Sequence, residues 1–204
     1  MPECRFDYES WFPEDVQSRF LKNLCSYIDS PSKFLEVGSF EGRSAIWVLD
    51  NILVHPESRL TCVDPCYGGY EANLRFNLST YIDAGKCQLV EEYSEAGLPK
   101  LLHAGEVGTY DFAYIDGCHH SEYVLRDAVM SFLLLKEDGI MVFDDYKWRG
   151  GRFRGTRLGV WNPEPAVDGF LSIHQGSIEV IEMGYQVWVR KTRNFPNLPE
   201  GVLD

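Results

Sequence analysis

The sequence predicts a doubly wound α/β fold, in which a mostly parallel seven-stranded sheet carries helices on both faces and ends in an antiparallel C-terminal hairpin. Short apolar segments alternate five times with segments of helical spacing, as strands buried on both faces of a parallel sheet do. Two strand-like segments then follow, joined by a link too short for a parallel crossover. A chain of 204 residues with 45% hydrophobic content can bury one sizeable core.

The N-terminal segment is expected to form an amphipathic helix over residues 14–28. Val16, Phe20 and Leu24 recur at helical spacing, and acidic residues stand in the first turn, where they suit the helix dipole. Alternating strands and helices follow: strands at 33–39, 59–64, 87–92, 110–116 and 139–145, and helices at 43–53, 70–82, 95–105 and 121–136.

The C-terminal part has a different pattern. A loop rich in Gly and Arg (147–159) precedes a helix at 164–175, and strands at 177–183 and 185–191 flank Gly184. Repeats and linkers that would mark a second domain are absent from the sequence. We therefore expect a single domain over 1–204, with a helical lead-in (1–32), a core (33–191) and a tail (192–204).

Charge and composition exclude some classes of function. With 31 acidic and 19 basic residues the formal charge is −12, which repels nucleic acid and anionic membranes. No apolar run approaches the roughly 20 residues of a membrane span, and the N-terminus lacks a signal-peptide profile. A cytoplasmic protein is expected. Its six cysteines (4, 25, 62, 66, 87 and 118) show no C-x-x-C, which predicts reduced and mostly buried thiols.

A glycine turn follows the first expected strand, at the edge where ligands of α/β sheets bind. Glu36 precedes Gly38-x-x-x-Gly42, and Asp64 stands at the tip of the second strand. Such glycines let the backbone approach a ligand, and an acid at the second strand binds ribose hydroxyls in nucleoside-binding sheets. A plain strand-to-helix corner is the alternative. The G-x-G-x-x-G spacing that NAD would favour is absent.

From about residue 33 to 191 the chain resembles class I S-adenosylmethionine (SAM)-dependent methyltransferases with a Rossmann-like fold. The stretches FLEVGSFEGRSAIWVLDNI, LTCVDPCYGG, PAVDGFL and the segment from YDFAYIDGCHH to VFDDYKW are similar to the family that includes macrocin-type sugar O-methyltransferases. The resemblance implies SAM as cofactor. Its methionine part would lie against Glu36, Gly38, Ser39, Gly42 and Ser44, its ribose against Asp64, and its adenine beside Tyr93 and Ser94, with Asp116 also at the cofactor. For Tyr93, a half-exposed loop aromatic is the alternative.

Acidic residues end the fourth and fifth expected strands. Adjacent parallel strands lie about 4.8 Å apart, so Asp116, Asp144 and Asp145 would reach one cation. Three carboxylates suit Mg²⁺ or Mn²⁺, and the resemblance implies the same ligand set. Solvated acids at strand ends are the alternative.

A zinc site would have to combine residues from the second and fourth strands: Cys62, Cys66, Cys118 and His119. The first strand is expected to separate those two strands, so their tips would stand roughly 10 Å apart. Thiolate ligation at about 2.3 Å does not span that distance, which disfavours zinc.

The DGCHH stretch (116–120) offers candidates for the catalytic base. Methyl transfer to an alcohol requires the hydroxyl to lose its proton. His119 occupies the histidine position of the family pattern Asp-Gly-x-His, so it is expected to be the base or to orient the metal ligands, with Asp116 and Asp145 completing the catalytic set. Some relatives carry an acid where this chain has Cys118, which leaves the identity of the base open.

The arginine-rich loop is expected to overhang this site and to bind substrate. Five cations fall within 147–157, without an acid, and Arg forks grip phosphate or carboxylate. A mobile loop with solubilising charge is the alternative, and a surface role is the alternative for His120. The predicted substrate contacts are His120, Tyr146, Trp148, Arg152 and Arg154.

Together these features favour a SAM-dependent, divalent-metal-assisted O-methyltransferase. The expected acceptor is a hydroxyl of a small molecule, a sugar or glycan first, and the expected partners are glycosyltransferase domains or a second copy in a homodimer. A catechol-type small-molecule O-methyltransferase is one alternative. A catalytically silent cofactor-binding module in a glycan-assembly complex is another. RNA methylation is disfavoured by the net charge of −12.

Overall fold

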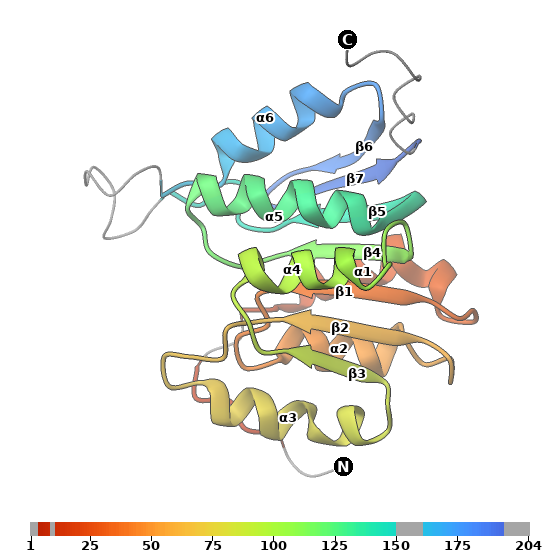
Figure 1. Ribbon diagram of the computed structural model, residues 1–204, viewed down its shortest axis with the longest axis vertical. Helices are drawn as coiled ribbons and strands as arrows, with labels where there is room; N and C mark the ends of the chain where they lie inside the picture. The colour runs from red at the N-terminus through yellow and green to blue at the C-terminus, as the bar shows by residue number, and fades with distance from the viewer. Residues whose placement is uncertain (1–3, 9–10, 150–160, 194–204) are drawn as a thin grey trace.

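The computed structural model describes residues 4–8, 11–149 and 161–193, and its core is a seven-stranded sheet. The strand order is β3-β2-β1-β4-β5-β7-β6 (Figure 1). The strands are β1 (Lys33–Val37), β2 (Arg59–Val63), β3 (Cys87–Val90), β4 (Tyr110–Ile115), β5 (Leu135–Phe143), β6 (Ile178–Met183) and β7 (Val187–Lys191). The first five pair in parallel, whereas β7 is antiparallel to both β5 and β6. The predicted sheet and its C-terminal hairpin are confirmed.

Helices cover both faces of the sheet (Figure 1). They are α1 (Glu14–Leu24), the short 3₁₀ helix η1 (Cys25–Tyr27), α2 (Arg43–Asn51), α3 (Glu71–Asp83), α4 (Ser94–His103), α5 (Ser121–Leu134) and α6 (Glu164–His174). One buried cluster joins α1, α2 and α3 to the sheet, and a second joins α4, α5 and α6 to its other face. Because side chains alternate along a strand, Phe34 belongs to the first cluster and Leu35 to the second.

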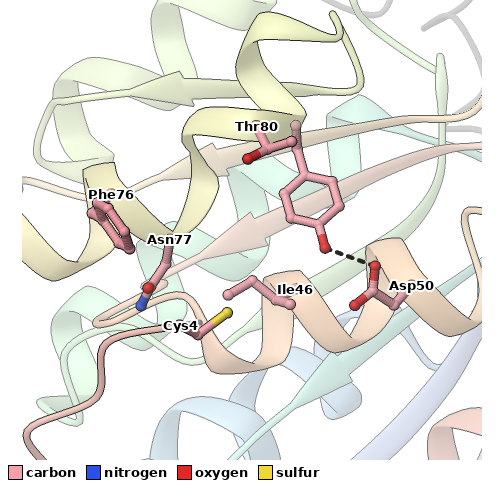
Figure 2. A pocket seen from close by; sticks show the side chains of 7 residues that line it. Cys4, Ile46, Asp50, Phe76, Asn77 and Thr80 are labelled. Atoms are coloured by element: carbon pink, nitrogen blue, oxygen red, sulfur yellow. Dashed lines mark hydrogen bonds between the residues drawn. The ribbon is translucent and has the colours of Figure 1, made fainter. Parts of the chain in front are cut away.

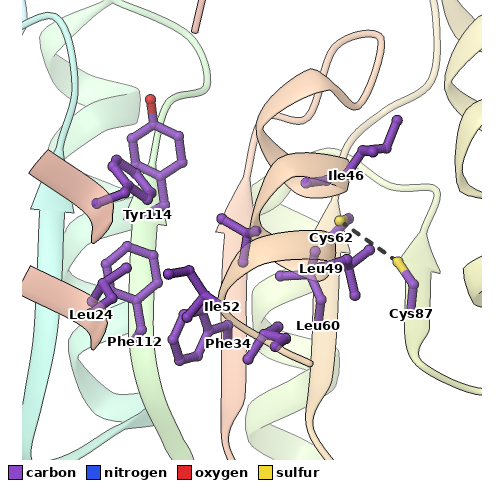
Figure 3. Packing of buried hydrophobic residues seen from close by; sticks show 14 of the residues in the cluster. Leu24, Phe34, Ile46, Leu49, Ile52, Leu60, Cys62, Cys87, Phe112 and Tyr114 are labelled. Carbon is purple, nitrogen blue, oxygen red and sulfur yellow. Dashed lines mark hydrogen bonds between the residues drawn. The ribbon is translucent and has the colours of Figure 1, made fainter. Parts of the chain in front are cut away.

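The first cluster is built around aromatic rings (Figure 3). Phe20 of α1 is fully buried and lies over the middle of the sheet, where edge-on contacts between rings add to the burial of apolar area. Its ring centroid lies between 5.0 and 6.4 Å from those of Phe12, Trp47, Phe112, Tyr114 and Trp188. The N-terminal helix thus closes one face of the core.

Element boundaries differ slightly from the sequence expectation. The helix expected over 121–136 ends at Leu134, and the strand expected from 139 begins at Leu135. The backbone of Leu135 is extended (φ −75°, ψ 136°), and this residue pairs with Tyr110 of β4. An unbroken apolar run hides this boundary, because a helix and a buried strand are both apolar there.

The cysteines are reduced, but they are not mostly buried as predicted. All six are free; Cys62, Cys66 and Cys87 are buried, whereas Cys4, Cys25 and Cys118 are exposed. The sulfur atoms of Cys62 and Cys87 lie 4.0 Å apart on neighbouring strands β2 and β3 (Figure 3). The three exposed thiols lie outside the sheet, whereas Cys62 and Cys87 are strand residues.

Within the part of the chain that the structure describes, none of the helices has the length and apolar character that crossing a bilayer requires.

Candidate active site

The loop after β1 approaches the end of β4 very closely at Gly38. Its φ is +86°, and a Cβ placed there would lie 2.3 Å from the carbonyl oxygen of Asp116. The Gly38 amide donates to Val63 O at 2.9 Å, and the Asp116 amide donates to Val37 O at 2.9 Å. Only glycine fits at this close crossing of the loop after β1 and the end of β4. The two hydrogen bonds join the carboxyl ends of β1, β2 and β4.

The carboxylate of Glu36 holds the same loop in place through hydrogen bonds. Ser39 Oγ donates to its Oε2 at 2.6 Å and Ser44 Oγ to its Oε1 at 2.5 Å. Burial raises the pKa of Glu36, although the two serine hydroxyls and the Cys62 thiol lower it. The carboxyl group is only 3% exposed, so the side chains of Glu36, Ser39 and Ser44 bind one another. Gly42 is the N-cap residue of α2, with a φ of +82°, and it lies against α3.

Asp64 fastens the glycine loop to the end of β2. Its Oδ2 accepts from the amides of Ser39 (2.9 Å) and Phe40 (3.0 Å). Its Oδ1 accepts from the Cys66 amide (2.8 Å) and the Tyr70 hydroxyl (2.9 Å). The acid predicted to bind ribose is thus 2% exposed and carries four protein donors.

Tyr70→Phe should lower the free energy of unfolding by about 1–2 kcal/mol, because it removes one hydrogen bond to the buried carboxylate of Asp64. Urea unfolding measures the change. Tyr81→Phe is the matched control, since it removes an exposed bond to Asp50 on α2 and should cost under about 0.5 kcal/mol. Equal losses in the two variants would contradict the role given to Tyr70.

A cleft of about 490 Å³ opens above the ends of β1, β2 and β4. Gly38, Asp64 and Asp116 form its floor, and residues at the starts of α4 and α5 form its far wall. Aromatic side chains surround it: Phe40, Tyr67, Tyr70, Tyr93, Tyr123 and Trp161. Of the predicted cofactor residues, Gly38, Asp64, Tyr93, Ser94 and Asp116 line this cleft.

Three potential metal ligands meet at Asp116, which lines the cleft. Asp116, His119 and Asp145 each offer an atom within 4.8 Å of the others. His119 Nε2 lies 2.9 Å from Asp145 Oδ2, and the His119 ring packs edge-on against Trp148 at 4.7 Å. The expected meeting of the β4 and β5 ends is confirmed.

Asp144 is a charged neighbour of Asp116, but it is not one of the three residues whose ligand atoms lie within 4.8 Å of one another. Its Oδ2 accepts from the Tyr114 hydroxyl and, at 3.0 Å, from Gln186 Nε2, while its Oδ1 accepts from the Asp145 amide at 2.7 Å. The sequence predicts Asp116, Asp144 and Asp145 as the metal ligands. The structure adds His119 to the group formed by Asp116 and Asp145, and the ligand role of Asp144 stays a prediction.

Electrostatics distinguishes the clustered acids. Burial, followed by the charges of Asp144, Asp145 and Glu36, raises the pKa of Asp116 well above its ordinary value. Burial alone would also raise the pKa of Asp145, but the hydrogen bond and charge of His119, helped by the Tyr185 hydroxyl, outweigh it and lower that pKa. Within the cluster, Asp116 therefore favours its protonated form, whereas Asp145 stays ionised.

Residues 35–146 match the model of a family described as a methyltransferase domain. The chain belongs to the methyltransferase-domain family. The matched segment begins in β1 and ends directly after the acids that follow β5, so it contains the glycine loop and the acid cluster.

Two curated relatives match part of this methyltransferase. An uncharacterized protein of Acanthamoeba polyphaga mimivirus is 31% identical over 152 residues, covering 71% of this chain and 66% of that protein. A probable caffeoyl-CoA O-methyltransferase of Dictyostelium discoideum is 25% identical over 145 residues, covering 71% of this chain and 56% of that protein. The chain therefore spans less than two thirds of the length of the curated relatives it matches.

Solved structures share the fold at low sequence identity. Cofactor-bound Rv0187 from MTB superposes with a TM-score of 0.65 at 19% identity, covering 94% of this chain and 85% of that one. A second structure is the O-methyltransferase TomG of Streptomyces achromogenes, which is involved in tomaymycin synthesis and was solved in complex with SAM. It superposes with a TM-score of 0.65 at 16% identity, covering 87% of this chain and 81% of that one. These likenesses concern the fold of the methyltransferase.

The predicted substrate residues have different surroundings. His120 caps α5, where its Nδ1 accepts from the Glu122 amide at 3.3 Å, and its ring packs against Trp161. Tyr146 is 8% exposed and donates to Asp168 Oδ1 at 2.9 Å, tying the loop after β5 to α6. Arg152 and Arg154 lie outside the described residues. Of the predicted contacts that the structure describes, Trp148 packs against the cluster, through His119.

A second, smaller cavity of about 120 Å³ lies between α2 and α3 (Figure 2). Cys4, Ile46, Asp50 and Phe76 are among its lining residues. It shares none of its lining residues with the cleft and is not part of the site.

Sequence reasoning missed several cleft residues of the methyltransferase. Tyr70, Trp161 and Tyr123 come from a loop and helix starts, where spacing carries no signal for the direction of a side chain. Asp127 did leave a signal, because it falls between Val124 and Phe132 on the apolar stripe of α5. An acid on a buried stripe is uncommon without a partner or a function.

Proposed function

We propose that this methyltransferase transfers a methyl group from SAM to a hydroxyl of a small acceptor, assisted by a divalent cation, with a sugar or glycan as the first candidate acceptor. The gathering of His119 and Asp145 around Asp116, which lines the cleft, carries this proposal. One relative and one structural neighbour, both named as O-methyltransferases, support it.

The cleft fits the proposed cofactor. It is about 490 Å³ in volume and borders the close glycine crossing at Gly38. Bound SAM would supply an electrophilic methyl group on a sulfonium. In this chain Gly38 would let the ligand approach the backbone, Asp64 would bind the ribose, and Tyr93 and Ser94 would border the adenine. Glu36, Ser39, Gly42 and Ser44 would support the methionine end through the loop that they hold in place.

The donor set of the cluster also fits a divalent cation. Carboxylate oxygens suit Mn²⁺ or Mg²⁺, and Asp116 and Asp145 would hold it, with Asp144 as the third predicted carboxylate, held by Tyr114 and Gln186. A cation there would polarise the acceptor hydroxyl and lower its pKa. His119, oriented by Asp145, would accept the hydroxyl proton.

The surroundings of the cluster suit a ring-shaped acceptor. Trp148 packs against His119, and an indole face can stack on a sugar ring as well as on a flat phenol. The name of the Dictyostelium relative, a caffeoyl-CoA O-methyltransferase, favours a phenol as the second candidate. The arginine loop with Arg152 and Arg154 would favour a phosphorylated, nucleotide-linked or acidic sugar.

Turnover with methyl-labelled SAM tests the proposal. We expect methylation of at least one member of a panel of nucleotide sugars, acidic glycans, neutral sugars and catechols, lost in EDTA and restored by Mg²⁺ or Mn²⁺. Product on a catechol alone would move the acceptor to the phenol class. Cofactor binding without turnover and without response to metal would instead indicate the silent assembly module. A cytoplasmic location, glycosyltransferase partners and a homodimer stay predictions.

A further inference from the structure

Asp127 of α5 is a buried acid whose carboxyl group is only partly satisfied. It is 2% exposed and lines the cleft, yet among the described residues its Oδ1 finds no hydrogen-bond partner. A buried polar atom without a partner costs about 1–3 kcal/mol in a protein interior. Such an atom at a ligand cleft points to a donor that the ligand supplies.

The position of Asp127 separates it from the acid cluster. A Cβ built on Gly117 would lie 3.6 Å from Asp127 Oδ2, so the carboxyl group faces the bare backbone after β4. Ser94, at the start of α4, hydrogen-bonds the same carboxyl group. Asp127 thus stands on the wall formed by α4 and α5, beside the residues expected to border the adenine.

A salt bridge closes this wall toward solvent. Arg126 Nη2 lies 2.8 Å from Glu95 Oε2 and joins α5 to α4. The Arg126 guanidinium also lies 4.6 Å from the ring centre of Tyr123, another cleft residue. Burial raises the pKa of Asp127 to about 6, despite the Ser94 hydrogen bond and the Arg126 charge. Near pH 8 the group is therefore ionised, and an ionised carboxylate only accepts hydrogen bonds.

We propose that Asp127 Oδ1 accepts a hydrogen bond from the exocyclic 6-amino group of the adenine and thereby selects an adenosyl over an inosyl cofactor. The inference rests on the proposed use of SAM. Adenine has an N–H donor at position 6, whereas hypoxanthine has a carbonyl oxygen there, which would face the carboxylate oxygen without a proton between them. A site built to bond an N–H discriminates strongly against an analogue that lacks it.

Calorimetric binding of S-adenosylhomocysteine and S-inosylhomocysteine at pH 8 tests the inference. The unmodified protein should bind the adenosyl compound at least about tenfold more tightly. Asp127→Asn should reduce this preference to within about threefold, because an amide can accept from the amine or donate to the carbonyl. Ser131→Ala is the matched control: Ser131 is a buried α5 residue whose hydroxyl is likewise without a partner among the described residues, and its loss should leave the ratio unchanged.

The possible outcomes separate this inference from the proposed function. If the unmodified protein binds neither compound, the proposed cofactor is wrong. If it binds both equally, or if Asp127→Asn keeps the full preference, the role of Asp127 is wrong while SAM use stands. A purely structural role would weaken both compounds by the same factor and leave their ratio unchanged, which also overturns the inference. Asp127→Ser gives the same comparison if the amide variant does not fold.

Discussion

Gly38→Ala is expected to abolish cofactor binding and to lower the free energy of unfolding by about 2–5 kcal/mol. A left-handed backbone costs an L-residue about 1–2 kcal/mol, and overpacking costs roughly 1–3 kcal/mol more. Here the added methyl would lie 2.3 Å from the Asp116 carbonyl oxygen and 2.5 Å from Gly117 Cα. These are backbone atoms, so relief requires the end of β4 to move away from β1.

Urea unfolding and titration with S-adenosylhomocysteine measure both effects. Gly108→Ala is the control, because Gly108 also has a positive φ (+64°) but has no atom within 4 Å of an added Cβ. It should cost only the backbone term of about 1 kcal/mol and leave binding intact. Similar losses in the two variants would show that the crossing at Gly38 is not tight.

Asp145→Asn is expected to reduce kcat/KM at least about 100-fold, because it removes the charge that orients the proposed base His119, and a positioned base contributes about that much or more. The variant keeps the shape of the side chain but removes the charge that faces His119 Nε2 at 2.9 Å. Binding of Mn²⁺, followed by electron paramagnetic resonance, should weaken as well. Asp168→Asn is the control. Asp168 lies on α6 and accepts a hydrogen bond from Tyr146, so its substitution should leave both kcat/KM and Mn²⁺ binding near those of the unmodified protein.

His119→Ala separates the two roles open to the imidazole. If His119 is the base, turnover falls while Mn²⁺ still binds to Asp116 and Asp145. If it is a ligand, both are lost together. Full turnover in either the His119 or the Asp145 variant would remove the cluster from the reaction.

The sheet could be predicted because its signals are local. Alternating apolar runs and helical spacing identify the elements, and the parallel rule brings Asp116 and Asp145 to neighbouring strand ends. The match of residues 35–146 to a methyltransferase domain agrees with that reasoning.

What the sequence did not reveal depends on contacts between distant segments. Asp144 accepts hydrogen bonds from Tyr114 of β4 and Gln186 beside β7, and no spacing rule links those positions. Glu36 binds two serine hydroxyls inside the loop rather than facing the cleft. The finer assignment to sugar acceptors stays a prediction, because the acceptor is selected by side chains such as Trp148 and by the loop that follows it.

The four donors on Asp64 have a consequence for how a nucleoside enters. A carboxylate has about four lone-pair positions, and Ser39, Phe40, Cys66 and Tyr70 already use them. An arriving sugar hydroxyl would therefore replace the phenol of Tyr70 instead of adding a new bond. When the nucleoside binds or leaves, one hydroxyl would replace another on Asp64. Asp64 would therefore keep four hydrogen-bond donors throughout the catalytic cycle.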